Sequence, residues 1–303
     1  MDIYLPIANM SVNALLIVAL GGLVGVLSGL FGVGGGFLTT PLLIFYGIPP
    51  SVAVASATTQ ITGASVSGAL AHMRRGGVDL RMGAVMIVGG LFGSLAGAGI
   101  FRLLQSTGQI DTVIGIMYVL LLGSIGILML RDAVIALGWL TPSEPAEPKP
   151  RHNRWVAALP LRWRFYSSGL YISPIAPMLL GFLAGIMTVL LGIGGGFILV
   201  PAMIYLLGMA ARVVVGTSLV MILAVSAATT MIHALTTQAV DIVLAALLLV
   251  GGVIGAQYGA RLTTQLKPDL LRLSLAIIIL LVALRMALGL TYRPDEIFSI
   301  EYL

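Results

Sequence analysis

The sequence predicts an all-α polytopic membrane protein made of two homologous halves. Three observations support this fold class: the composition, long apolar runs, and a glycine motif that occurs twice. Of the 303 residues, 59% are hydrophobic and 9% are charged, whereas soluble domains average about 25% charged residues. The apolar runs, such as 82–101 and 270–284, are continuous. Continuous runs are typical of spanning helices and not of the alternating strands of membrane barrels.

The glycine motif interrupts an apolar run in each half. Residues 31–41 read FGVGGGFLTTP and residues 191–201 read LGIGGGFILVP. Glycine weakens a helix interior by about 1 kcal/mol relative to alanine, so each cluster is expected to break its helix. Unwound backbone inside a membrane must be buried in protein or line an aqueous cavity. We therefore expect Gly-broken helices that meet near the membrane midplane, where transporters bind their substrates.

The first half, residues 1–138, is expected to form the first transmembrane repeat. Its second segment is too short to cross a bilayer of about 30 Å at about 1.5 Å per residue. Its third segment is rich in hydroxyl groups, and Asp79 and Asp111 are expected to cap the fourth and fifth helices. The expected segments are 11–31, 37–46, 51–73, about 80–104 and 111–138.

A basic, proline-rich linker at 139–173 is predicted to be cytoplasmic and to separate the two repeats, and a polar tail follows at 291–303. The second repeat, 174–290, has the same order of segments as the first, and Asp241 corresponds to Asp79. The sequence is therefore an internal duplication. Its expected segments are 174–191, 197–207, 211–235, 241–262 and 267–290.

The positions of the basic loops help to choose between two possible topologies of the transmembrane segments. Basic residues cluster near 74–81, in the linker and near 261–272, and basic loops are typically cytoplasmic. If each glycine break is a turn between two segments, each half has five segments, the halves are inverted and all three loops share one side. If each break lies inside one bent span, each half has four crossings and the halves run parallel. The sequence thus predicts eight to ten transmembrane segments, and the charge pattern favours inverted repeats.

The membrane interior is predicted to favour anions. None of the 11 carboxylates lies in the middle of an expected span, and the chain has no cysteine. Cation transporters and proton pumps normally carry a buried carboxylate, and we expect neither a metal site nor a cofactor. Amides freed at the breaks, together with the hydroxyl groups of two polar helices, can instead bind an anion. The candidate substrate-binding residues are Gly34, Gly35, Gly36, Thr39, Thr58, Thr62, Ser65, Gly194, Gly195, Gly196, Thr217, Ser218 and Ser226.

The hydroxyl groups have a second interpretation, because serine and threonine also let membrane helices pack closely. Thr58, Thr62 and Ser65 lie on one face of their helix, as expected for either role. His72 and His233 occupy corresponding positions near helix ends. Each histidine is a candidate for a proton or substrate contact, or for a hydrogen bond to the backbone.

The first glycine motif, GLFGVGGGFLTTPLL followed by ASATT, resembles the sulfite exporter family, also called TauE/SafE or TSUP. The second copy, GIGGGFILVP followed by VGTS, resembles the second half of the same family. The resemblance covers about 13–290 and implies a permease for sulfur-containing anions such as sulfite, sulfoacetate or other organosulfonates. The two copies differ where Val200 replaces Thr40, and Gln60 has no polar counterpart. The second half is then expected to be the less polar side of the site.

The first functional hypothesis is a secondary transporter, an exporter of small anions in the bacterial inner membrane and not an enzyme. Its expected partners are the anionic substrate and the lipid bilayer, with a homodimer as a candidate assembly and no nucleic acid. An anion channel or a structural membrane subunit is the alternative. An intramembrane hydrolase would need Ser65 and His233 to face each other, and no residue is available to orient the histidine.

Overall fold

The computed structural model describes residues 2–31, 36–74, 76–136, 160–262 and 268–291. Within these ranges, five helices are long and apolar enough to cross a membrane, and nearly all of the remaining structure is helical as well. The fold is therefore the predicted all-α polytopic membrane fold. The five spans are Leu80–Ser106, Ile110–Ile135, Val213–Thr237, Ile242–Gly259 and Leu273–Thr291.

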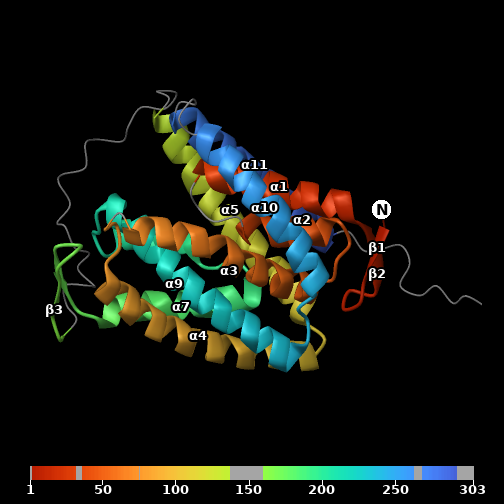
Figure 1. The fold of residues 1–303 in the computed structure, drawn as a ribbon, viewed down its shortest axis with the longest axis horizontal. Coiled ribbons are helices and arrows are strands. Elements are labelled where there is room, and N and C mark those ends of the chain that lie inside the picture. Colours follow the sequence, from red (N-terminus) through yellow and green to blue (C-terminus); the bar gives the residue numbers. More distant parts are fainter. Residues whose placement is uncertain (1, 32–35, 75, 137–159, 263–267, 292–303) are drawn as a thin grey trace, which may run out of the picture.

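The same order of elements occurs in each half: a β-hairpin, a helix, a short helix and three long helices (Figure 1). The first half consists of β1 (Asp2–Leu5), β2 (Met10–Asn13), α1 (Ala14–Phe31), α2 (Gly36–Phe45), α3 (Pro50–Arg74), α4 (Leu80–Ser106) and α5 (Ile110–Ala136). The second half consists of β3 (Trp163–Phe165), β4 (Leu170–Ile172), α7 (Ile175–Leu191), α8 (Gly196–Tyr205), α9 (Ala211–Ile232), the π-helix η1 (His233–Thr237), α10 (Ile242–Leu262) and α11 (Pro268–Thr291).

The two hairpins correct the sequence prediction. The span expected from residue 11 begins at Ala14, because the residues before it pair as β1 and β2. The end of the expected linker, 163–172, is not a loop but the hairpin of β3 and β4. Both hairpins bury apolar side chains, with Leu5 and Phe165 at most 1% exposed. Each hairpin thus packs against the helices through buried apolar side chains.

Each hairpin is bound by one buried aspartate of the opposite half. Asp79 caps α4 by accepting a hydrogen bond from the Met82 amide (3.0 Å), as predicted, and its second oxygen accepts from the Ser168 amide and hydroxyl at 3.0 and 2.7 Å. Asp241 accepts from the Leu244 amide (3.1 Å) and, in the turn of the first hairpin, from the Ile7 amide (3.2 Å). These carboxylates therefore satisfy buried amides and join the halves.

The same aspartates define the two ends of the bundle. The Asp79 amide donates to Thr217 near the start of α9 (2.9 Å), and the Asp241 amide donates to Ser56 near the start of α3 (3.2 Å). We call these the Asp79 end and the Asp241 end. Figure 1 shows the hairpin of β1 and β2 and the strand β3 at opposite ends of the molecule. Corresponding elements of the two halves thus begin at opposite ends.

Glycine rows bring the helices of opposite halves into contact. Along α1 and α10, a Cβ on Gly21 would lie 2.6 Å from the Leu248 carbonyl oxygen, and Gly25 meets Gly252 with no room for a Cβ. The residue numbers of the contacting partners increase together along the two helices, so α1 and α10 run parallel. Helices α4 and α7 repeat this packing, for example where Gly185 meets the Gly90 carbonyl. Close approach of small residues is the usual way in which membrane helices associate.

Two further helix pairs run antiparallel and complete the contacts between the halves. Gly68 on α3 packs against Leu219 on α9, while Thr62 lies beside Ser226. Helices α5 and α11 also pack together, and the partner of Gly115 on α5 is Leu290 near the end of α11. Every one of these four helix pairs joins one half to the other, so neither half forms a separate core.

Candidate substrate site

The second glycine motif breaks the chain between α7 and α8. Gly192, Gly194 and Gly195 have φ angles of 67°, 69° and 73°, in the left-handed region that disfavours residues with a Cβ. The Gly192 amide closes α7 by donating to Thr188 (2.9 Å), and the Leu199 amide donates to Gly195 (2.8 Å) as α8 begins. The predicted helix break is thus present in the second half. In the first half, Gly34 and Gly35 lie outside the described residues.

The two breaks meet in the interior. Phe37 and Phe197 follow the first residue of α2 and of α8, and their rings stack with centroids 4.5 Å apart and planes 6° apart. Both rings are at most 3% exposed. Gly36, at the start of α2, lies against Ile61, and a Cβ there would lie 3.0 Å from the Gly192 carbonyl oxygen. The amino ends of two short helices therefore converge at one place, and each end carries a partial positive charge.

Helices α3 and α9 cross beside this place with their hydroxyl groups facing each other. The Thr62 hydroxyl lies 3.0 Å from that of Ser226 and 3.5 Å from that of Thr230, and it also donates to the Thr58 carbonyl. Ser65, on the next turn of α3, is 5% exposed and forms no hydrogen bond with any described residue. A buried hydroxyl without a partner costs stability unless a water or a ligand satisfies it.

A second polar group links α2 and α3 to the glycine-packed helix α10. Thr39 donates to the Gln60 side-chain oxygen (3.1 Å), and the Gln60 amide donates to the Leu248 carbonyl (3.3 Å). All of these side-chain groups are buried. Gln60 therefore fixes the position of Thr39, a predicted site residue, next to the start of α2.

The carboxyl end of α7 is held by two hydroxyl groups of the first half. The Leu191 carbonyl accepts hydrogen bonds from Thr40 (3.3 Å) and from the Tyr118 hydroxyl. Sequence analysis missed Tyr118 because it lies within the apolar run of α5 and its partner is distant in sequence. Its only signal was a tyrosine hydroxyl in that run. Thr40 has no hydroxyl counterpart in the second half, where the corresponding residue is Val200.

Other predicted residues lie away from the crossing or bond only within their own helix. Thr58 is fully buried and donates to the Val54 carbonyl (2.7 Å), and Ser218 donates to the Val215 carbonyl (3.0 Å). The Thr217 hydroxyl accepts a hydrogen bond from the Asp79 amide near the start of α9. These three hydroxyls have structural partners, whereas Thr62, Ser65 and Ser226 are gathered at the crossing.

The two histidines differ despite their corresponding positions. His233 is fully buried, where its Nε2 lies 3.1 Å from the Val189 carbonyl and its Nδ1 lies 3.2 Å from the Thr237 hydroxyl. Its ring also meets Phe101 edge-on, with centroids 4.9 Å apart. His72 is only half-buried near the end of α3. The hydrogen bond of His233 to a backbone carbonyl is the second of the two roles expected from the sequence. The two histidines occupy corresponding positions, but their surroundings differ.

The geometry does not assemble the hydrolase that the sequence left open. Thr62 faces Ser226 and Gly68 faces Leu219, so Ser65 lies at the level of about Ile222 on α9. His233 lies eleven positions farther along, which is roughly 16 Å at about 1.5 Å per residue. Among the described residues, no group of three or more His, Cys, Asp or Glu side chains could hold a metal ion.

Comparisons with known proteins give a family and several relatives that cover most of the chain. The profile of the family described as "Sulfite exporter TauE/SafE" matches residues 17–286. The chain is 30% identical over 273 residues to the "Probable membrane transporter protein YjnA" of Bacillus subtilis, covering 89% of this chain and 98% of that protein. It is 28% identical over 263 residues to a "Probable membrane transporter protein" of Xylella fastidiosa, covering 86% and 89%. No solved structure gives a significant match.

Proposed function

Because this chain belongs to the sulfite exporter TauE/SafE family of membrane transporters, we propose that it is a secondary transporter that exports small sulfur-containing anions such as sulfite or organosulfonates. The observation that carries this proposal is the meeting of the two helix breaks at the stacked Phe37 and Phe197 rings. Substrate sites of secondary transporters typically form where broken helices of two repeats meet.

The proposed site binds the anion with dipoles and hydroxyl groups in place of fixed charges. The starts of α2 and α8 supply the positive ends of two helix dipoles, and the first amides of a helix have no partner within it, so the two ends together attract an oxyanion. Thr62, Ser65 and Ser226 would donate hydrogen bonds to the same anion as it passes the crossing of α3 and α9.

We further propose that the halves are inverted repeats and that the Asp79 end is cytoplasmic. The antiparallel pairs α3–α9 and α5–α11 support inversion, as does the position of the hairpins at opposite ends. Described arginines near the Asp241 end are Arg102 and Arg285, and those near the Asp79 end are Arg74, Arg81, Arg131, Arg162, Arg164, Arg212, Arg261 and Arg272. The positive-inside rule then orients the molecule.

Cysteine labelling tests this orientation against a background without native cysteine. A cysteine replacing Thr107, in the loop at the Asp241 end, is expected to react with an impermeant thiol reagent added to intact cells. A cysteine replacing Tyr166, in the hairpin at the Asp79 end, is expected to react only after the cells are opened. Both residues are exposed, so accessibility depends on the side of the membrane alone. Reaction of both cysteines in intact cells would contradict the orientation.

Flux into proteoliposomes tests the function directly. The purified protein is expected to carry sulfite, or a short sulfonate such as sulfoacetate, with saturation and with mutual competition between substrates. In a parallel thermal-shift screen, a ligand at one hundred times its Kd should add about 2.7 kcal/mol to the free energy of unfolding. Flux that does not saturate would favour the anion channel, and no flux with any sulfur oxyanion would favour a structural subunit.

A further inference from the structure

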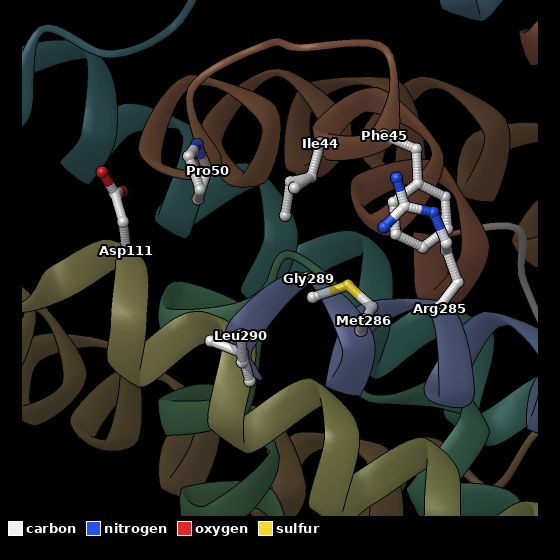
Figure 2. Close-up of a pocket in the computed structure, with 9 residues that line it drawn as sticks. Ile44, Phe45, Pro50, Asp111, Arg285, Met286, Gly289 and Leu290 are labelled. Atoms are coloured by element: carbon white, nitrogen blue, oxygen red, sulfur yellow. The ribbon is translucent and has the colours of Figure 1, made fainter. Parts of the chain in front are cut away.

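A cavity of about 240 Å³ lies at the Asp241 end, outside the site described above. It is open on one side and is lined by the end of α2, the start of α3, the start of α5 and the last turns of α11 (Figure 2). Two glycines on facing helices make room for it. The Arg285 side chain extends over Gly289, where a Cβ would lie 3.6 Å from the guanidinium, and a Cβ on Gly115 would lie 3.0 Å from Leu290. The remaining lining residues are Ile44, Phe45, Pro50, Asp111 and Met286.

Arg285 supplies the cavity with a positive charge. Its guanidinium carbon lies 5.3 Å from the centre of the Phe45 ring, and Figure 2 shows the two groups against each other. Among the residues that the structure describes, no carboxylate forms an ion pair with Arg285. Within the part of the chain that the structure describes, its N–H groups have no hydrogen-bond acceptor, and an aromatic face attracts the charge but takes no in-plane hydrogen bond.

The one carboxylate in the lining already has a partner. Asp111 does not cap α5 as predicted, since it lies within the first turn of that helix. Instead its carboxylate lies near the Ser51 amide at the start of α3, where the helix dipole favours negative charge. Figure 2 places Asp111 and Arg285 at opposite edges of the cavity. Asp111 is thus directed to α3, and the charge beside Phe45 stays positive.

We propose that this cavity is a second anion site, which binds the oxyanion head of an amphiphilic monoanion at Arg285 and its first carbons between Phe45, Met286 and Leu290. The arginine matches a sulfonate, phosphate or carboxylate head. The volume is below the roughly 300–1,000 Å³ of pockets that enclose a whole drug-sized ligand. The rest of the ligand would therefore extend along the outside of α11, where Leu281, Leu284 and Leu288 are at least half exposed.

Two sources can supply such a ligand: a free alkyl sulfonate or an anionic phospholipid from the bilayer. The experiment compares the wild type with Arg285→Gln in detergent. The first arm measures binding of pentanesulfonate by calorimetry, and the second measures retention of phosphatidylglycerol by native mass spectrometry. Arg102→Gln is the matched control, because Arg102 is exposed near the same end and does not line the cavity. Gly289→Leu keeps the arginine and fills the cavity.

We expect Arg285→Gln and Gly289→Leu each to weaken binding about tenfold or more in at least one arm, since a charge-assisted bidentate contact is lost or blocked. Arg102→Gln should equal the wild type. Loss in the first arm alone assigns the site to free alkyl anions, and loss in the second alone assigns it to lipid. Equal binding by the wild type and all three variants in both arms overturns the proposal. None of the three substitutions lies in the proposed transport site, so pentanesulfonate binding that Arg285→Gln and Gly289→Leu leave unchanged belongs to the transport site, and only the binding that they remove belongs to this cavity.

Discussion

Gly195→Leu is expected to abolish anion flux while the protein still inserts into the membrane. Gly195 has a φ of 73°, which costs a residue with a Cβ about 1–2 kcal/mol. A Cβ there would also lie 3.1 Å from Ala184, and the longer leucine side chain would extend into the region where α8 begins. The free amides would then be covered or displaced. Flux in proteoliposomes, normalised to the amount of inserted protein, measures the effect.

Two controls separate this effect from a general loss of folding. Gly99→Leu introduces the same side chain in α4, where a Cβ meets nothing within 4 Å, so flux should stay within about twofold of the wild type. Gly195→Ala adds only the strained Cβ and should keep a measurable part of the flux. All three variants should elute as a single species on size exclusion. If Gly195→Leu elutes normally and transports as the wild type does, the break in the second half is not part of the pathway.

Much of the architecture could be predicted because it depends on local sequence. The duplication, the short helices that follow the glycine motifs and the caps at Asp79 and Asp241 all follow from residue spacing and are present in the structure. Glycine clusters break helices wherever they occur, and an aspartate before an apolar run caps a helix in most contexts. These signals need no knowledge of distant contacts.

The hairpins and the partners of the helices could not be predicted in the same way. Strands of three or four residues, such as β3 and β4, are too short for an alternating pattern to stand out. The glycines of α4 and α10 pack against α7 and α1, which are each in the other half. Sequence spacing shows that a helix has a small-residue face and does not show which helix meets it.

The candidate site was predicted in part for the same reason. The expected stripe on α3 included Thr58, Thr62 and Ser65, which share a face of the helix. Thr58 turns out to bond within α3, whereas Thr62 reaches Ser226 on α9. Which of these hydroxyls reaches the other half depends on where α3 and α9 cross. That crossing depends on contacts between residues more than 150 positions apart in the sequence. Gln60 and Tyr118, which hold the two breaks in place, are likewise defined by their distant partners.

Thr62→Asp is expected to reduce anion affinity at least tenfold. Thr62 lies at the crossing of α3 and α9, beside the converging starts of α2 and α8. A carboxylate about 8 Å from a bound monoanion opposes it by about 2 kcal/mol at an effective dielectric near 20, and about 1.4 kcal/mol corresponds to tenfold in affinity. The measurement is sulfite or sulfonate binding by calorimetry on the purified variant.

Thr62→Asn is the decisive comparison, because asparagine has nearly the size of aspartate and no charge. If the crossing faces the anion, the asparagine variant should bind at least five times more tightly than the aspartate variant, and Thr62→Ser should bind nearly as the wild type does. If Thr62 serves only to pack α3 against α9, the asparagine and aspartate variants should show the same anion affinity, even though the buried charge of the aspartate costs more stability. Equal anion affinities of the two correctly inserted variants would show that Thr62 and its partner Ser226 are not part of the substrate site.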